Sequence, residues 1–243
     1  VTVYARPHYV KSTEKVFRGV SLVFTPSIRT KHLDAITHTF VSTLHALFQD
    51  YEVIHFHSIG PSIFSILPRI FRPDMRVIAT FHSRDYFHQK WNWFAKSCLH
   101  LAERITCTIP ERTIVISKTL AEYAEATYRK AFVMIPNGAD VHVSAKTDTL
   151  KALGLKEGQY VLSVSRLVRH KGIHYLIKAF QALKETSELP NGWKLVIVGA
   201  HAETKDYAEY LEFLAADDAD ILLVGERSGE DLAELYTHAG VFV

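Results

Sequence analysis

Two cations, Arg166 and Lys171, are the residues whose types and spacing point most directly to chemistry. They lie in the stretch Val161–Gly172, where a short apolar, β-branched run gives way to charge and then to a glycine. The following residues, Ile173–Leu183, carry apolar side chains at helical spacing, so the pattern predicts a strand, a basic turn and a helix. Backbone N–H groups and the positive end of a helix dipole point into such a turn. We therefore expect an anion there.

A diphosphate is the anion that this turn fits best. Arginine can bind two phosphate oxygens at once, and lysine adds a compact positive charge. The turn matches neither the Walker pattern nor Gly-x-Gly-x-x-Gly, so it is not a standard nucleoside triphosphate or dinucleotide site. The spacing alone leaves one alternative open, in which both cations are solvated side chains on a surface loop.

Three histidines in the first half of the sequence are further candidates. His55 and His57 alternate along a predicted strand, so they share a face and are candidate metal ligands, although no third ligand with suitable spacing accompanies them. Hydrogen bonding to the backbone, or the lining of a ligand cleft, is the ordinary alternative. His82 follows the apolar run Val77–Phe81, at the carboxyl end of a strand, which is where open α/β sheets bind ligands.

Strands and helices that position these residues are predicted to alternate along the chain. The predicted strands are Val1–Ala5, Val20–Thr25, Val53–His57, Val77–Phe81, Thr113–Ile116, Phe132–Ile135, Tyr160–Val164, Lys194–Val198, Ile221–Val224 and Val241–Val243. The predicted helices are Thr37–Phe48, Trp93–Ile105, Thr119–Tyr128, Gly172–Lys184, Asp206–Ala215 and Glu230–His238, with Ser117 as a helix cap. This alternation indicates βαβ units and parallel sheets, and hence an α/β protein.

A polar, Pro- and Gly-containing stretch interrupts the alternation at Pro136–Ser144. We therefore predict two domains, residues 1–140 and 141–243. Both ends of the chain fall within strand-like runs, Val1–Ala5 and Val241–Val243, which would leave sheet edges unfinished. The sequence is therefore expected to be a fragment truncated at both ends.

Composition narrows the class of protein. Of the 243 residues 48% are hydrophobic and 22% are charged, which is typical of a soluble globular protein. The net charge of +2 is too small to indicate nucleic acid as a partner, and no apolar run is long enough to span a bilayer. Cys98 and Cys107 have neither zinc nor redox spacing, so reduced thiols in the cytoplasm are expected.

The segment S-R-L-V-R-H-K-G, residues 165–172, resembles the S/G-R-L-x-x-x-K-G motif of the retaining GT-B glycosyltransferases of family 4. In that family the Arg and Lys hold the diphosphate of a nucleotide-sugar donor. Four more segments resemble family motifs: V-I-H-F-H-S-I-G-P (53–61), T-F-H-S (80–83), V-M-I-P-N-G-A-D (133–140) and the segment 223–243. The resemblance covers nearly the whole chain and implies two Rossmann-like parallel-sheet domains facing a cleft, with the second domain incomplete.

The resemblance also implies roles for individual residues. Those implied to be catalytic are His82, Arg166 and Lys171. Those implied to bind the donor are Arg166, Lys171, Gly199, Gly225 and Glu226. Those implied to line the acceptor side of the cleft are His57, Gly60, Ser83 and Arg84. No metal or other cofactor is implied.

The function implied by the resemblance is transfer of a sugar, of hexosyltransferase type, from a nucleotide-diphosphate donor to a glycan, lipid-linked or small-molecule acceptor, with retention of configuration. Such an enzyme is expected in the cytoplasm and in polysaccharide or glycoconjugate synthesis, and peripheral membrane contact and oligomeric state stay open. A family Gly-rich loop before Val1 and an acidic segment after Val243 are missing, so part of the active site is expected to be absent. Two alternatives remain: a nucleotide-sugar-binding protein without turnover, and a nucleotide-sugar epimerase of similar build.

Overall fold

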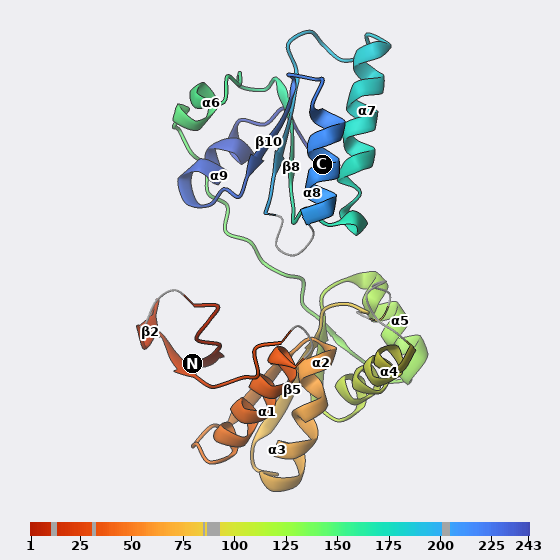
Figure 1. The fold of residues 1–243 in the computed structure, drawn as a ribbon. Coiled ribbons are helices and arrows are strands. Elements are labelled where there is room, and N and C mark those ends of the chain that lie inside the picture. The colour runs from red at the N-terminus through yellow and green to blue at the C-terminus, as the bar shows by residue number, and fades with distance from the viewer. Residues whose placement is uncertain (11–13, 31–32, 85, 87–92, 201–204) are drawn as a thin grey trace. The chain divides into compact units, whose positions relative to one another are not determined.

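The structure is a computed structural model that describes residues 1–10, 14–30, 33–84, 86, 93–200 and 205–243. Contacts divide the chain into two compact units, Val1–Gly138 (unit 1) and Ala139–Val243 (unit 2). Both units contain a parallel sheet with helices packed against it (Figure 1). The mixed α/β composition and the parallel sheets confirm the predicted fold class.

Unit 2 is a four-stranded parallel sheet between two layers of helices. The strand order is β10–β9–β8–β11, formed by β8 (Tyr160–Val164), β9 (Lys194–Val198), β10 (Ile221–Gly225) and β11 (Val241–Phe242). One face of the sheet packs against α7 (Ile173–Glu185) and α8 (Lys205–Ala215), and the other against α6 (Asp148–Ala152) and α9 (Gly229–Thr237). β9 is therefore covered on both faces, which explains its uninterrupted apolar sequence.

Unit 1 contains two sheets instead of one. The larger is parallel, in the order β4–β5–β6–β7, formed by β4 (Val53–His57), β5 (Arg76–Phe81), β6 (Arg112–Val115) and β7 (Val133–Met134). The smaller has the order β1–β3–β2, in which β1 (Thr2–Ala5) runs parallel to β3 (Val20–Phe24) and β2 (Val16–Phe17) runs antiparallel to it. No backbone pairing joins the two sheets within the described residues.

The helices of unit 1 are α1 (Asp34–Leu47), α2 (Ile59–Ser62), α3 (Ile66–Phe71), α4 (Trp93–Thr108) and α5 (Lys118–Tyr128). They cover one face of the larger sheet, where alternate strand residues such as Phe56, Ala79 and Val115 are buried. A buried glutamate, Glu103 on α4, ties this layer together because its Oε1 accepts hydrogen bonds from Tyr123 and Tyr128 on α5, at 2.8 and 2.6 Å.

Most of the predicted elements are present. Each predicted strand and helix is found, with ends that differ by at most three residues from the prediction. Ser117 caps α5 by accepting from the Leu120 N–H at 3.3 Å. Four short elements were not predicted: β2, α2, α3 and α6, which are between two and six residues long. Segments this short contain too few turns or alternations to show a period.

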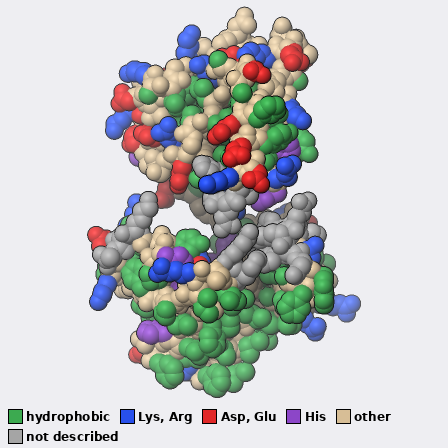
Figure 2. Space-filling model, viewed as in Figure 1, with side chains coloured by type: hydrophobic (Ala, Val, Ile, Leu, Met, Phe, Trp, Pro, Cys, Tyr) green, Lys and Arg blue, Asp and Glu red, His purple; other side chains and the backbone are tan. Residues whose placement is uncertain are grey.

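One surface of unit 1 is unusually apolar. Its residues come from one side of α1 and from the end of α3: Ile36, Phe40, Leu44, Phe48, Ile70 and Phe71, all exposed. Figure 2 shows hydrophobic side chains gathered over this part of unit 1. No helix within the described residues is long and apolar enough to cross a bilayer.

Candidate functional site

The basic turn in unit 2 has the predicted strand–turn–helix form. β8 ends at Val164, a short 3-10 turn spans Arg169–Lys171, and Gly172 adopts φ +72° immediately before α7 begins. Residues with a side chain rarely adopt this backbone conformation, which explains why glycine occupies the position. The turn lies at the carboxyl end of β8 and the amino end of α7, which is the expected position for an anion site.

Arg166 and Lys171 are both exposed, and neither side chain forms a hydrogen bond or an ion pair with any residue that the structure describes. Arg169, between them, lies over the rings of Tyr207 and Tyr210, with its guanidinium carbon 5.6 and 5.9 Å from their centroids. Arg166 and Lys171 thus differ from Arg169, because their side chains contact no partner among the described residues. Their positive charge remains available to a ligand.

Two glycines lie at the same edge of the unit 2 sheet. The Gly199 N–H donates to the Gly225 carbonyl oxygen at 2.9 Å, so the ends of β9 and β10 meet. A Cβ on Gly199 would lie 1.9 Å from the Ser165 carbonyl oxygen, so only glycine lets the start of the basic turn approach this closely. Gly225 has φ +72° with open space around it, and Glu226 after it is exposed.

Arg227 is a further cation at this edge, and it was not predicted. It follows Gly225 by two residues, and its Nε is buried without a hydrogen-bond partner among the described residues. A buried guanidinium nitrogen without a partner is costly, and a ligand atom would remove that cost. A cation two residues after a glycine that ends a predicted strand was the signal available in the sequence.

In unit 1 the candidate residues lie at the carboxyl ends of β4 and β5. His57 is the last residue of β4 and pairs in register with Thr80 of β5. His82 lies two residues beyond Thr80, directly after β5 ends at Phe81. His57 Nδ1 and His82 Nε2 are 3.2 Å apart, and their rings are stacked with centroids 5.5 Å apart. Gly60 lies in the first turn of α2, and Ser83 and Arg84 directly follow His82.

His55 lies further down the same face of β4. Its Nε2 is 2.7 Å from the Thr80 hydroxyl, and its ring centroid is 4.2 Å from that of His57. Desolvation lowers the pKa of His55 and of His57 from 6.5, and repulsion between neighbouring imidazoles lowers both further. Both rings therefore favour the neutral form. The described residues contain no group of three or more His, Cys, Asp or Glu side chains placed to hold a metal ion.

The polypeptide turns sharply after His57. Ser58 has φ 71° and ψ 159°, a region that is almost restricted to glycine. Its N–H donates to the Thr80 carbonyl oxygen at 3.0 Å, and its own carbonyl oxygen accepts from the Ser62 hydroxyl at 2.7 Å. This strained backbone lies next to His57, which contacts His82.

On the loop after β5, the Arg84 guanidinium carbon lies 4.2 Å from the centroid of the Tyr123 ring.

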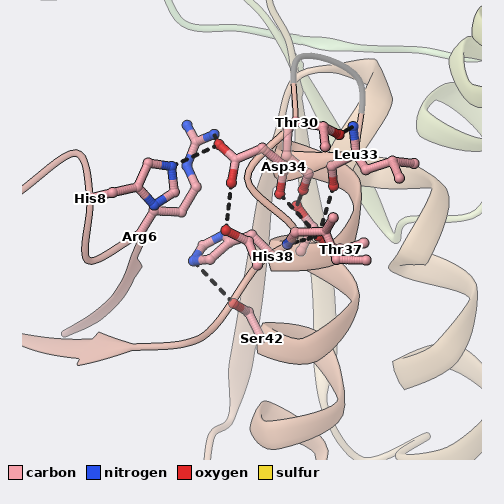
Figure 3. Close-up of polar contacts among 12 residues, drawn as sticks. Arg6, His8, Thr30, Leu33, Asp34, Thr37, His38 and Ser42 are labelled. Carbon is pink, nitrogen blue, oxygen red and sulfur yellow. Dashed lines mark hydrogen bonds and ion pairs between the residues drawn. The ribbon is translucent and has the colours of Figure 1, made fainter.

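A second polar cluster in unit 1 surrounds Asp34, at the start of α1, and it was not predicted (Figure 3). Arg6 Nη1 lies 2.6 Å from Asp34 Oδ2, His8 Nε2 lies 3.1 Å from the same atom, and the Ser27 hydroxyl donates to Oδ1 at 2.5 Å. Burial alone would raise the pKa of Asp34, but these three hydrogen bonds outweigh it and lower the pKa. The cluster fastens the segments after β1 and β3 to α1.

Two family models match the chain. Residues 1–143 match the model described as Glycosyltransferase Family 4, and residues 146–243 match Glycosyl transferases group 1. An uncharacterized glycosyltransferase from Methanocaldococcus jannaschii is 28% identical over 156 residues, which is 60% of this chain and 39% of that protein.

Solved structures show the same fold. Sucrose-phosphate synthase from Thermosynechococcus elongatus matches with a TM-score of 0.74 and 19% identity, over 99% of this chain and 64% of that one. UDP-N-acetylglucosamine 2-epimerase from Rickettsia bellii matches with a TM-score of 0.56 and 16% identity, over 88% of this chain and 56% of that one. At these identities the likeness concerns the fold alone, and this chain spans less than two thirds of each of these relatives.

The two family models and the two parallel-sheet units indicate the same family. One model matches the first 143 residues, and the other follows it along the chain. The chain belongs to glycosyltransferase family 4, with the GT-B type of fold.

Proposed function

We propose that this chain carries the donor and acceptor sites of a glycosyltransferase that uses a nucleotide-diphosphate sugar. The observation that carries the proposal is the basic turn, where Arg166 and Lys171 are exposed and lack partners among the described residues at the junction of β8 and α7. Family membership supports glycosyl transfer as the reaction class.

In this proposal the turn binds the diphosphate and promotes its departure. When the bond to the sugar breaks, negative charge develops on the diphosphate oxygens. Arg166 and Lys171 stabilise that charge more strongly in the transition state than in the ground state, which is the condition for accelerating the reaction. Gly225, Glu226 and Arg227 lie at the end of β10, on the other side of β9 from β8, and complete the donor side.

The acceptor side is proposed to lie in unit 1, around His57 and His82. A neutral imidazole can both donate and accept a hydrogen bond, so the contacting pair suits the hydroxyl groups of a sugar. Gly60, Ser83 and Arg84 line the same strand ends. Transfer with retention, without a bound metal, to a glycan, lipid-linked or small-molecule acceptor completes the proposal.

Calorimetry with nucleoside diphosphates tests the role of the turn. Arg166→Ala and Lys171→Ala are each expected to weaken binding of the best ligand among UDP, GDP and ADP by about 1.5–3 kcal/mol, the range for hydrogen bonds to charged groups. The affinity for the matching nucleoside, which has no phosphate, should hardly change.

Lys178→Ala is the matched control, because Lys178 is an exposed cation on α7, about two helical turns after Lys171. Its affinity for the diphosphate should equal that of the unmodified chain. Equal losses for nucleoside and diphosphate in the Arg166→Ala chain would mean that Arg166 maintains structure and does not bind phosphate.

A further inference from the structure

The basic turn in unit 2 has two halves, which are anchored to different elements. In the first half, the Leu167 N–H donates to the Ala200 carbonyl oxygen at 3.1 Å, just beyond the end of β9. This bond holds the neighbouring Arg166 beside β9. The second half, residues 169–174, meets α8 instead, and the side chain of Tyr207 contacts this half at both of its ends.

The Tyr207 hydroxyl caps the amino end of α7. It accepts a hydrogen bond from the His174 backbone N–H at 3.3 Å, and the ring nitrogen Nδ1 of His174 lies 2.8 Å from the same oxygen. The first N–H groups of a helix have no carbonyl partner within the helix, and Gly172, which precedes α7, has no side chain that could cap them. A side chain from another helix therefore supplies the cap.

The ring of Tyr207 contacts the turn at a second point. The Arg169 guanidinium carbon lies 5.6 Å from the centroid of the ring, which is within the range of a cation–π interaction. Tyr210, three residues later on α8, contributes a second ring 5.9 Å from the same carbon. Tyr207 thus contacts the turn at Arg169 through its ring and at His174 through its hydroxyl, and Lys171 lies between these two points.

Tyr207 is itself held by the core of unit 2. It is buried in the same cluster as Ile173 and Leu211, and α7 and α8 pack side by side on one face of the sheet (Figure 1). Burial raises the pKa of Tyr207, although the His174 N–H and the positive charge of Arg169 act in the opposite direction. The hydroxyl is therefore neutral near pH 7, and packing of the core fixes its position.

The cap also limits which groups can bind an anion at this turn. The His174 N–H is already engaged by Tyr207, and the N–H groups of the next two residues donate to the Gly172 carbonyl oxygen at 2.8 and 3.3 Å. Three of the first four N–H groups of α7 are thus engaged. Binding of a phosphate at the turn therefore depends chiefly on the side chains of Arg166 and Lys171, and on where the turn holds them.

We propose that Tyr207 is a positioning residue of the basic turn, which fixes the backbone on both sides of Lys171 so that this cation meets the diphosphate. The inference rests on the proposed function of the turn, and it identifies the side chain that aligns one of its two cations. Because Arg166 is held through the backbone by β9, Tyr207 acts on Lys171 and not on Arg166.

Calorimetry on a set of double variants tests this proposal. Tyr207→Phe keeps the ring beside Arg169 and removes the cap. Its affinity for the best ligand among UDP, GDP and ADP is expected to fall about five- to tenfold, with unchanged affinity for the matching nucleoside. In a Lys171→Ala chain the same substitution should change the affinity by less than about twofold, whereas in an Arg166→Ala chain it should retain its full effect.

Tyr210→Phe is the matched control. Tyr210 lies on the same helix and its ring faces the same arginine, but its hydroxyl forms no hydrogen bond within the part of the chain that the structure describes. This variant should bind the diphosphate as the unmodified chain does. Equal losses of nucleoside and diphosphate affinity in Tyr207→Phe would indicate a general disturbance of unit 2 and would overturn the proposal, as would an undiminished effect in the Lys171→Ala chain.

Amide hydrogen exchange, followed by NMR, gives a measurement that needs no ligand. The His174 amide should exchange at least about tenfold faster in Tyr207→Phe than in Tyr210→Phe because its acceptor is gone, with the amides of β9 unchanged as the measure of intact folding. Equal exchange in the two variants would overturn the proposal. If the unmodified chain binds none of the three diphosphates, the proposed function fails, and the His174 amide still decides whether Tyr207 fixes the turn.

Discussion

At the residue scale, the two candidate sites differ in the charge of their side chains. In unit 1 the neutral forms of His55 and His57 are favoured because both rings are partly desolvated and lie beside other imidazoles. In unit 2, the positively charged side chains of Arg166 and Lys171 form no ion pair with any described residue. The proposed acceptor side thus offers neutral hydrogen-bonding groups, and the proposed donor side offers positive charge.

Protonation of the histidines is expected to destabilise unit 1. A histidine whose pKa is lower in the folded state binds fewer protons there than in the unfolded state, so the free energy of unfolding falls as the pH drops below 6.5. The thermal midpoint should therefore be lower at pH 5.5 than at pH 7.5. In His55→Gln the difference between the two midpoints should be smaller.

Histidine NMR gives the direct measurement. The His55 and His57 ring signals should titrate below pH 6.5, with assignments from the His55→Gln and His57→Gln chains. His142→Gln is the control, because the His142 side chain is 67% exposed, and this change should leave those titrations unaltered. Titration of either ring above pH 6.5 would contradict the expected repulsion.

At the scale of elements, the geometry of the proposed donor site depends on how closely the carboxyl ends of β8 and β9 approach each other. The Leu167 N–H donates to the Ala200 carbonyl oxygen at 3.1 Å, and the Ser165 N–H donates to Val198 at 3.0 Å. These bonds fix the start of the basic turn against the segment that contains Gly199. The position of Arg166 is thus set by two strand ends together.

Gly199→Ala is expected to reduce both stability and ligand affinity. The added methyl group would overlap the Ser165 carbonyl oxygen, so the turn must shift, at a cost of about 3 kcal/mol, the upper part of the range for overpacking. Gly225→Ala is the matched control, because it meets no atom and carries only the cost of its positive φ, about 1–2 kcal/mol.

Denaturant unfolding and calorimetry with the best nucleoside diphosphate separate these two variants. Gly199→Ala should lose more stability than Gly225→Ala and should bind the diphosphate more weakly. If the two variants lose the same stability, the close approach of Ser165 is not a constraint on the fold.

At the scale of the whole molecule, the chain contains two parallel-sheet units, and in each unit the main candidate residues lie at or just after the carboxyl ends of strands. This holds for His57 and His82 in unit 1 and for Arg166 and Gly225 in unit 2. Carboxyl ends of parallel strands gather at one edge of a sheet, so residues far apart in sequence meet there. The same rule explains both sites.

Chelation should affect neither unit. No set of three or more potential ligands is placed to bind a metal ion among the described residues, and the contacting pair His57 and His82 supplies only two nitrogens. EDTA is therefore expected to leave the thermal midpoint and the diphosphate affinity unchanged. If EDTA lowered the thermal midpoint by several degrees and zinc restored it, His55 and His57 would be ligands of a metal site.

The sequence by itself determined the longer elements and the basic turn. Strands such as Lys194–Val198 and the helix after Gly172 show their period within a few residues, because side-chain burial in a strand or helix repeats locally. The Arg166 to Lys171 spacing is likewise local. These features need no knowledge of what lies across the sheet.

Only the tertiary structure decided which segments meet. The contact of His57 with His82, the cluster of Asp34 with Arg6, and the close approach of Gly199 to Ser165 all join separate segments. The order of the strands in each sheet is of the same kind, since no local pattern states which strands are neighbours. Pairing between strands depends on the free energy of long-range contacts, and a period of two or 3.6 residues does not encode it.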